Sequence, residues 1–370
     1  MKKSCLKSFQ MVPLFFLCLL MPLHAGDLKG KPPDAEQFPS LVKSVRFEEP
    51  VLFCGEKVPL EDQQVRERLE KEMLLALWDR AQVVLWIKRS TKYFPHIERV
   101  LKQEKLPLDL KYVAVIESGL RPHAGSVKGA VGFWQFLRST GREYGLRVDS
   151  KIDERRNLFT ATRAACGYFQ KLYEKFQSWP LSMAGYNMGE HGLANEIELQ
   201  KERDYYQLYL PLETQRYVLK AVAAKLIMEN PEQYGFAFLD GDYYPEVQFD
   251  RVKMDSPSEV PLVVIAASAK TSFKRIKDLN PQIRGAHLAR GKNTVLIPKG
   301  GAKRFEKRFT RLFKNWRLTN VKRFHLVKKG ENLSTIAREY NVSLASLLVW
   351  NNLSLKSRIY PGQRVMITSQ

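Results

Sequence analysis

The segment LKYVAVIESGL, residues 110–120, decides the fold class of the middle of this chain. Its apolar run ends at one carboxylate, Glu117, and Gly119 follows two residues later. Pro107 suits the first turn of a helix and a glycine suits the end of one. We therefore expect a short apolar helix that delivers Glu117 to a glycine-rich loop over 119–132. A carboxyl at such a helix end should be partly desolvated, which favours the protonated acid near neutral pH.

Helical periodicity surrounds this segment on both sides. From about Glu61 to Gln103, apolar residues recur every three or four positions, and few stretches alternate with period two. Asn157 is a good helix cap. Further helices are expected over about 158–176, from Pro180 onward and over 217–228. The sequence therefore predicts one mostly helical domain over 61–245.

Length and charge narrow the class of protein. The chain has 370 residues, of which 44% are hydrophobic and 27% charged, which excludes a disordered tail and a disulfide-dense miniprotein. Its net charge of +21 indicates a polyanionic partner, such as nucleic acid, anionic lipid or an acidic wall polymer. Charge alone leaves these partners, and plain solubility, open.

The N-terminus has the pattern of an export signal. Three lysines precede the apolar run 11–23, and Ala25 supplies a small residue after it. We interpret 1–25 as a secretory signal peptide, with an uncleaved anchor as the alternative, and the Pro-rich stretch 26–60 as a linker. Export predicts a periplasmic or cell-envelope location, with membrane association left open, and argues against nucleic acid as the partner.

The sequence indicates no metal or cofactor. The six histidines lie singly, without the spacing of metal ligands, and no glycine-rich phosphate loop or nucleophile triad is visible. Outside the signal, two cysteines remain, Cys54 and Cys166. They either form a disulfide or are two buried thiols.

Two copies of one small unit follow the helical domain. With an offset of 71, Asn351 falls on Asn280, and after one inserted residue Val365-Met366-Ile367 falls on Val295-Leu296-Ile297. Each unit is predicted to fold as strand, helix, helix, strand, over 250–299 and 324–370. Between them, 300–323 is a basic amphipathic linker: 299–329 holds twelve Lys or Arg and one acid, interleaved with aromatic residues. It is either a membrane or nucleic-acid surface or a helix that docks on its own domain.

The second copy resembles the LysM module, which binds glycans that contain N-acetylglucosamine. The residues that carry the resemblance are His325, Val327, Gly330, Asn332-Leu333, Ile336-Ala337, Tyr340, Val342-Ser343, Asn351, Ile359 and Pro361-Gly362-Gln363. The resemblance implies glycan contacts at Gly330, Asn332, Leu333 and Asn351. The first copy departs from the pattern, because Glu259 replaces the turn glycine and prolines stand where the first strand and helix should begin. We therefore expect its first strand and its sugar site to be lost.

A second resemblance covers the helical domain. Its motifs are Glu117-Ser118-Gly119, Ser126, Gly129 to Gln135, Ser139-Thr140-Gly141, Tyr144-Gly145-Leu146, Tyr186-Asn187 with Gly189-Glu190, and Glu213-Thr214 with Tyr217-Val218. In this order they resemble the soluble lytic transglycosylase family, which implies a goose-type-lysozyme-like helical fold. The expected fold class is thus mostly α, with small α+β LysM modules of βααβ order.

The resemblance also implies roles for individual residues. Glu117 is the single acid and base, while Ser118, Ser126, Gln135, Tyr186, Asn187 and Glu213 lie at the substrate. Tyr186 is expected to face Glu117, whereas Trp134 and Tyr217 are interpreted as core or cleft-wall aromatics. The implied reaction cleaves peptidoglycan glycan strands without water and leaves 1,6-anhydro ends. The alternatives are a hydrolytic muramidase of the same fold and a non-catalytic peptidoglycan-binding protein.

Overall fold

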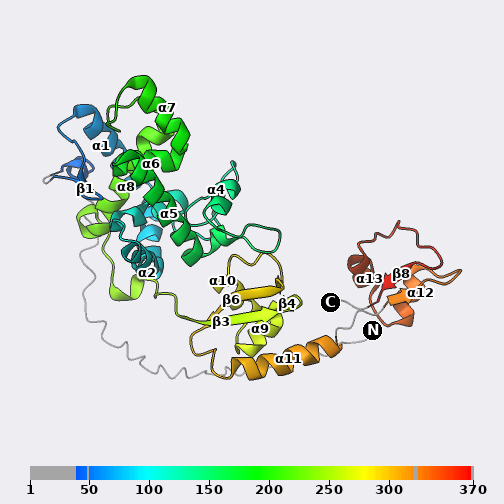
Figure 1. Cartoon of the computed structure of the whole chain (residues 1–370). Coiled ribbons are helices and arrows are strands. Elements are labelled where there is room, and N and C mark those ends of the chain that lie inside the picture. The colour runs from blue at the N-terminus through cyan, green and yellow to red at the C-terminus, as the bar shows by residue number, and fades with distance from the viewer. Residues whose placement is uncertain (1–38, 48–49, 320–323, 368–370) are drawn as a thin grey trace, which may run out of the picture. The chain divides into compact units, whose positions relative to one another are not determined.

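A computed structural model describes residues 39–47, 50–319 and 324–367 (Figure 1). The predicted signal, 1–25, and the first part of the predicted linker lie outside the described residues. Among the described helices, none combines the length and apolar character needed to cross a bilayer.

Eight α-helices form the first part of the described chain, and they confirm the mostly helical fold predicted from periodicity. They are α1 Gln63–Trp78, α2 Arg80–Gln103, α3 Lys111–Ser118, α4 Arg138–Glu143, α5 Leu158–Phe176, α6 Trp179–Met188, α7 Glu190–Gln200 and α8 Leu212–Glu229. Short 3-10 turns lie at Lys43–Val45, Leu108–Leu110, Glu154–Arg156, Pro231–Tyr234 and Asp240–Asp242. The Asn157 side chain caps α5 as expected, accepting hydrogen bonds from the amides of Phe159 and Thr160. Helices α4 and α7 were not predicted.

Helix α3 lies inside this domain, between α2 and α8. Val113, Ala114 and Val115 are fully buried. The Tyr112 hydroxyl donates to Glu229 on α8 over 3.0 Å. Tyr112 to Val115 are buried, whereas Glu117 in the last turn of α3 is only partly buried, so the helix presents this carboxylate at its C-terminal end.

The prediction of a linker over 26–60 is wrong for its last ten residues, 51–60. They form a small hairpin of β1 Leu52–Phe53 and β2 Glu56–Lys57. Val51, Phe53, Val58 and Leu60 are buried in the core of the helical domain. The amide of Cys54 donates to Asp109 over 2.7 Å, ahead of α3. Cys54 and Cys166 are free thiols, so the disulfide alternative is also wrong.

The two predicted copies have the same order of main elements and matching contacts. The first copy consists of β3 Phe249–Ser256, α9 Leu262–Ser268, α10 Phe273–Leu279 and β6 Gly291–Pro298, with a minor pair of β4 Val260–Pro261 and β5 His287–Leu288. The second consists of β7 Phe324–Leu326, α12 Leu333–Glu339, α13 Leu344–Asn351 and β8 Arg364–Met366. In each copy one asparagine joins the end of the second helix to the last strand.

These asparagine brackets have the same geometry. Asn280 donates to the carbonyls of Ile276 and Leu296 over 2.8 and 2.7 Å, and it accepts from the Leu296 amide over 2.8 Å. Asn351 makes the corresponding three bonds, over 2.8, 2.8 and 2.7 Å, to Leu347 and Met366. The spacing to the strand residue differs by one, which is the inserted residue that the alignment requires.

The first copy has not lost its first strand, contrary to expectation. Strand β3 pairs antiparallel with β6 along its full length, with Val252 opposite Val295. Val252 and Met254 contribute to the module's apolar core. The sequence did not predict this strand because it lies before Pro257 and lacks a His-x-Val pattern. In the second copy that pattern stands at His325 and Val327, in and directly after the corresponding strand, β7.

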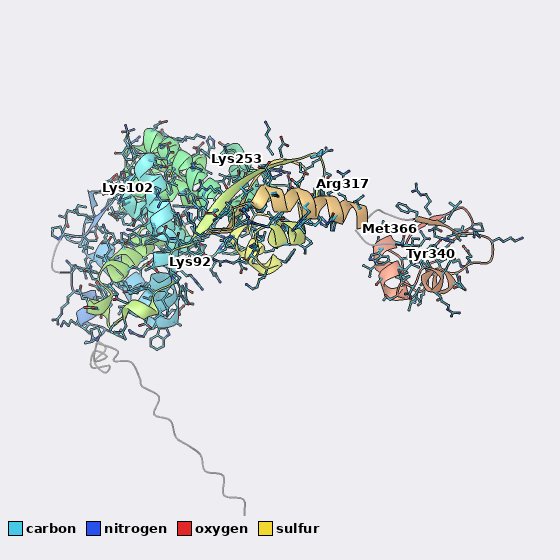
Figure 2. All side chains as sticks on the ribbon, turned by 90° about the horizontal axis from the view of Figure 1, so that it is seen from below. Lys92, Lys102, Lys253, Arg317, Tyr340 and Met366 are labelled. Atoms are coloured by element: carbon cyan, nitrogen blue, oxygen red, sulfur yellow. The ribbon has the colours of Figure 1, made fainter. Side chains whose placement is uncertain are left out.

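The basic stretch contains a helix, α11 Phe305–Thr319, that docks on its own module. Phe305 is buried in the core of the first copy, and Phe309 and Phe313 pack against it. The apolar face of α11 is therefore occupied by its own module, as the docking interpretation expects. Figure 2 marks Arg317 in the last turn of α11, together with Lys253 on β3.

Candidate active site

Glu117 lies in the last turn of α3, one residue before the helix ends. Gly119 ends the helix in the left-handed conformation, with φ of 56°. A Cβ at this position would lie 2.8 Å from the Gln82 side chain, so a glycine fits both the conformation and the close packing. The Gly119 carbonyl also accepts a hydrogen bond from Arg89 over 2.9 Å. These contacts fix where Glu117 leaves the helix.

The Glu117 carboxyl accepts a hydrogen bond from Tyr217, which was expected to be a core or cleft-wall aromatic. The Tyr217 hydroxyl on α8 donates to Glu117 Oε1 over 2.5 Å. Tyr217 is itself buried, and burial together with the nearby Glu117 charge raises its pKa well above the usual value. It therefore stays protonated and acts as a donor. Its position one helical turn after Glu213 was the available signal.

Burial raises the pKa of Glu117 to about 7. The hydrogen bond from Tyr217 lowers this pKa, the charge of Glu213 raises it, and the charge of Lys220 lowers it. Desolvation wins, so the carboxyl holds its proton near neutral pH, as an acid catalyst requires. The sequence-based expectation of a desolvated carboxyl agrees with this value.

Tyr186 lies near Glu117 but bonds elsewhere. Its hydroxyl donates to the Trp134 carbonyl over 2.7 Å, and its ring stacks on Phe169 with centroids 4.6 Å apart. Burial raises the pKa of Tyr186 well above its usual value, and the Glu117 charge adds to this rise. In the structure, the tyrosine that holds the Glu117 carboxyl is Tyr217 rather than Tyr186.

Ser118, which was expected at the substrate, has an enclosed side chain that bonds to the backbone. Its side chain is buried, and the hydroxyl lies 2.9 Å from both the Ala114 and the Phe133 carbonyls. It also accepts from the Arg121 amide over 3.3 Å. Ser118 therefore ties the end of α3 to the loop that follows, because its place on the helix points it inward.

Ser126 and Gln135 belong to the loop that follows α3. Ser126 is exposed and accepts from the Ala130 amide over 3.1 Å, which closes a turn. Gln135 has a positive φ of 47°, and its side-chain amide donates to the carbonyls of Ala124 and Gly132 over 3.2 and 2.8 Å. Both residues therefore shape the loop through bonds to its backbone.

Asn187 and Glu213 both lie near the start of α8, with different partners. Asn187 accepts from the Thr214 hydroxyl over 2.8 Å, which joins the end of α6 to α8. Glu213 is exposed and lies 3.7 Å from Lys128 Nζ, on the glycine-rich loop. Its charge reaches Glu117, since it contributes to the raised pKa of that carboxyl.

The residues expected to bind glycan in the second module have structural partners. Asn351 makes the bracket described above, Leu333 is buried, and Asn332 caps α12 by accepting from the Thr335 amide over 2.9 Å. Gly330 has a φ of 89°, and a Cβ added to it would meet no atom within 4 Å, so its surroundings are open. Of these four residues, Gly330 is the one whose exposed backbone has open space beside it.

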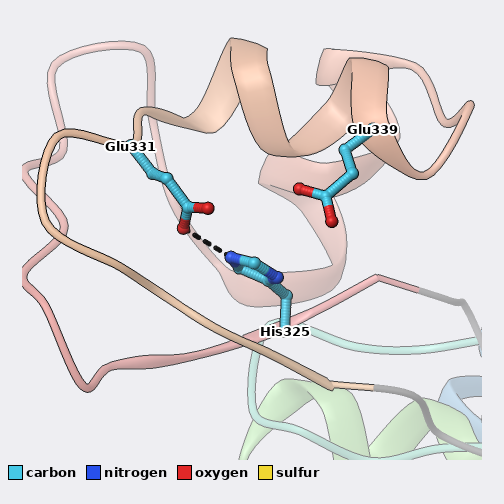
Figure 3. Close-up of side chains that lie close together, drawn as sticks. All are labelled: His325, Glu331 and Glu339. Carbon is cyan, nitrogen blue, oxygen red and sulfur yellow. Dashed lines mark hydrogen bonds and ion pairs between the residues drawn. The ribbon is translucent and has the colours of Figure 1, made fainter.

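One histidine does come together with acidic residues, although the sequence spacing gave no sign of it. His325, Glu331 and Glu339 place potential ligand atoms within 4.8 Å of one another (Figure 3). Both imidazole nitrogens are already hydrogen-bonded: Nε2 lies 2.5 Å from Glu331 and Nδ1 lies 3.0 Å from the Tyr340 hydroxyl. A metal ion bound to this imidazole would have to replace one of these bonds.

Comparison with known proteins agrees with both resemblances. The model of the Transglycosylase SLT domain matches residues 95–209, and that of the LysM domain matches 325–368. Membrane-bound lytic murein transglycosylase D of Escherichia coli (strain K12) is 31% identical over 334 residues, which cover 85% of this chain and 72% of that protein. Peptidoglycan transglycosylase gp16 of Escherichia phage T7 is 37% identical over 99 residues, covering 26% of this chain and 8% of that protein.

Among solved structures, the 70 kDa soluble lytic transglycosylase SLT70 of Escherichia coli gives a TM-score of 0.34 at 17% identity, covering 49% of this chain and 31% of that one. The assignment to a family therefore rests on transglycosylase D, which matches this chain over most of both sequences. With 31% identity over most of both sequences, an SLT domain and a C-terminal LysM domain, the chain belongs to the family of lytic murein transglycosylases that includes transglycosylase D.

Proposed function

We propose that this lytic murein transglycosylase cleaves the β-1,4 bond between N-acetylmuramic acid and N-acetylglucosamine without water, and that Glu117 acts first as the acid and then as the base. The observation that carries the proposal is the Glu117 carboxyl itself. It is partly buried, has a pKa of about 7, and is held by the Tyr217 hydroxyl at 2.5 Å. Such a group can both give and take a proton near neutral pH.

The proposed reaction has two proton transfers. Glu117 protonates the glycosidic oxygen, and the bond between C1 of the muramic residue and that oxygen breaks. The N-acetyl group of the same sugar stabilises the positive charge that develops at C1. The Glu117 carboxylate then takes the proton of the C6 hydroxyl, whose oxygen bonds to C1. The product ends in 1,6-anhydro-N-acetylmuramic acid, and Glu117 is again protonated.

The carboxylates near Glu117 favour this course over hydrolysis. Retaining and inverting hydrolases use two carboxylates that flank the bond. Among the described residues, the acid that acts on Glu117 through its charge is Glu213, which is exposed and faces Lys128. An exposed carboxylate beside a lysine is poorly suited to hold a nucleophilic water or to attack C1. The muramic residue therefore supplies its own nucleophile.

Tyr217 has a defined part in this proposal. Its hydroxyl stabilises the Glu117 carboxylate that forms after the first proton transfer, because a hydrogen bond to the charged form favours that form. Tyr186 holds the Trp134 carbonyl and packs beside the site. Its part is to fix the position of the loop next to Glu117 rather than to bind the carboxyl.

The second LysM copy holds the enzyme on the wall. A weak glycan module raises the local concentration of substrate without touching the bond that breaks. We place the protein in the periplasm or cell envelope, bound to peptidoglycan glycan strands. The apolar face of α11 is docked on its module, so the exposed lysines and arginines of the helix face outward. Their positive charge makes an anionic membrane surface a second partner.

A pair of variants tests the proposal. Glu117→Gln keeps the shape of the side chain and cannot deliver a proton, so we expect release of products from purified sacculi to fall by at least ~10²–10⁴-fold. Glu229→Gln is the matched control, because Glu229 also accepts from a tyrosine hydroxyl and lies away from Glu117. Mass spectrometry identifies the products.

Borohydride treatment separates the alternatives. Anhydro ends keep their mass, whereas the reducing ends of a hydrolase gain two hydrogens. Reducing ends from the unaltered enzyme would establish the muramidase alternative. Absence of any released product would establish a wall-binding protein without catalysis, and near wild-type turnover by Glu117→Gln would remove Glu117 from its assigned role.

A further inference from the structure

The first LysM-like copy is joined to the helical domain through backbone hydrogen bonds. The Asp153 amide donates to the Gln282 carbonyl over 2.8 Å, and the Arg284 amide donates to the Lys151 carbonyl over 2.8 Å. Between them, Ile152 forms an antiparallel bridge with Ile283. The segment 151–153 is thus paired, like a short strand, with the loop between α10 and β6.

Ile152 is an integral part of the module's core. It is 5% exposed and belongs to the same apolar cluster as Ile283 and Val260 of the first copy. At the rim, Lys151 forms an ion pair with Glu259 over 3.0 Å. Glu259 stands where the second copy has its turn glycine, so the substitution that breaks the LysM pattern contributes a contact to the helical domain.

The second copy shows what this loop looks like without such a partner. Its counterpart of Arg284, by the offset of 71, is Leu355, which is 79% exposed. In the first copy the corresponding backbone is hydrogen-bonded to the backbone of Lys151 and Asp153. This loop is therefore exposed in the second copy, whereas in the first copy it is covered by residues 151–153 of the catalytic domain.

Asp153 links this junction to a buried ion pair. The residue is 1% exposed, and its carboxylate accepts two hydrogen bonds from the Arg155 guanidinium, each 2.9 Å long. Arg156 and Arg284 lie 3.7 Å from the same carboxylate. Burial alone would raise the pKa of Asp153, but the bonds and charges of Arg155 and Arg156 outweigh burial and lower it. The carboxylate is therefore charged and fixes the direction of Arg155.

Arg155 in turn clamps the glycine-rich loop beside Glu117. Its guanidinium donates to the carbonyls of Gly129 and Phe136 over 2.9 and 3.0 Å. Its own carbonyl packs against Gly132 so closely that a Cβ there would lie 1.9 Å from the oxygen. The clamped loop carries Gln135 and the Trp134 carbonyl to which Tyr186 is bonded.

We propose that the first LysM-like copy has become a positioning element of the active site: it takes the segment 151–153 as its partner instead of glycan, and holds the loop 129–136 in place through Asp153 and Arg155. These are positioning residues, since neither contacts Glu117. The inference rests on the proposed function for its effect on turnover. Loss of this support lets the loop drift, and a displacement of about 1 Å near a reacting centre can cost up to about 10²-fold in rate.

The test uses two pairs of variants of the full chain. Ile152→Asp places a charge in the module's core and should undock it, whereas Ile152→Val keeps the contact. Arg284→Pro removes the amide that donates to Lys151, whereas Arg284→Ala keeps that amide and removes the side chain. The second pair serves if Ile152→Asp does not fold.

Three measurements are made on each variant. They are kcat and KM on a soluble glycan fragment, hydrogen exchange of the amides in 125–136, and retention on sacculi at high salt. We expect both undocking variants to lose exchange protection at residues 153 and 284 and in 125–136, with helices α1, α2 and α8 protected as before. We expect kcat to fall by about 10- to 100-fold, with KM changed much less and sacculus retention kept by the second copy.

The outcomes are distinct. Wild-type kcat and wild-type protection of 125–136 in a variant that has lost protection at residues 153 and 284 would overturn the proposal. A fall in sacculus retention with unchanged kcat would instead make the first copy a wall-binding module. If the unaltered enzyme proved inactive, the proposed function would fail, and the exchange of 125–136 would still decide whether the module holds the loop.

Discussion

The Tyr217→Phe variant tests the centre of the proposed mechanism. Phenylalanine removes the hydroxyl that donates to Glu117 over 2.5 Å and keeps the ring that is buried on α8. The Glu117 carboxyl then stays in the same desolvated place without its principal stabilising bond. Because that bond favours the charged form, its loss must raise the pKa of Glu117 above its value of about 7.

The magnitude follows from the energy of such a bond. A hydrogen bond to a charged group contributes about 1.5–3 kcal/mol. Since 1.36 kcal/mol corresponds to one pH unit, the pKa of Glu117 should rise by about one to two pH units. The variant's acid is also weaker. If about half of the proton has moved in the transition state, about half of that energy is lost, and kcat/KM on the acid side falls roughly 4- to 13-fold.

The assay is kcat/KM as a function of pH, with a soluble peptidoglycan fragment as the substrate. The enzyme must start with Glu117 protonated, so the rate of the unaltered enzyme should decline as pH rises through about 7. In the variant this decline should move upward by about one to two pH units. Tyr112→Phe is the matched control, because it removes a tyrosine–glutamate bond between the same two helices, to Glu229. An unchanged alkaline limb in Tyr217→Phe would refute the reasoning.

Three further results are expected. Gly132→Ala should lower both melting temperature and turnover, because its Cβ would collide with the Arg155 carbonyl oxygen, whereas Gly145→Ala, also at positive φ but with no atom within 4 Å, should cost much less. Deleting 324–370 should weaken retention on sacculi and spare cleavage of soluble fragments, and full retention of the truncated chain at high salt would contradict this. Glu117→Gln should be more stable than the unaltered enzyme above about pH 7, by at most about 3 kcal/mol in thermal unfolding. The raised pKa makes ionisation costly in the folded state, so this gain should vanish below about pH 4, where the carboxyl is protonated in both states.

Local sequence signals predicted the parts of the fold that depend on local physics. Asn157 begins α5 and Gly119 ends α3 because caps act within one turn of the chain. The repeat was found because its asparagine bracket and strand residues recur at nearly fixed spacing. Glu117 stood out as the carboxylate that ends an apolar helix, and the resemblance of the motifs around it, rather than the helix end itself, implied its role as acid and base.

The parts that were missed depend on contacts between distant segments. Residues 51–60 look like a linker, yet they complete the core through Phe53 and Val58. Tyr217 and Glu117 are a hundred positions apart, and the spacing of Tyr217 from Glu213 shows at most that they share a helix face, so the bond to Glu117 does not follow from the sequence. Ser118 has a hydroxyl that could bind a sugar and stands next to Glu117 in the motif. Only the structure shows that its side of the helix faces inward, where the hydroxyl bonds to the Phe133 carbonyl.

The asparagine brackets have a consequence for how such a chain can change over evolutionary time. In both copies the bracket secures the module from behind, through the second helix and the last strand, and leaves the loop after that helix out of the bonding. Within one protein, that loop has come to carry Gln282 and Arg284 in one copy and Leu355 in the other while the brackets stayed the same. The bracket and the loop's polar contacts therefore belong to different residues, so a duplicated module can change the partner of this loop while it keeps the bracket that joins its second helix to its last strand.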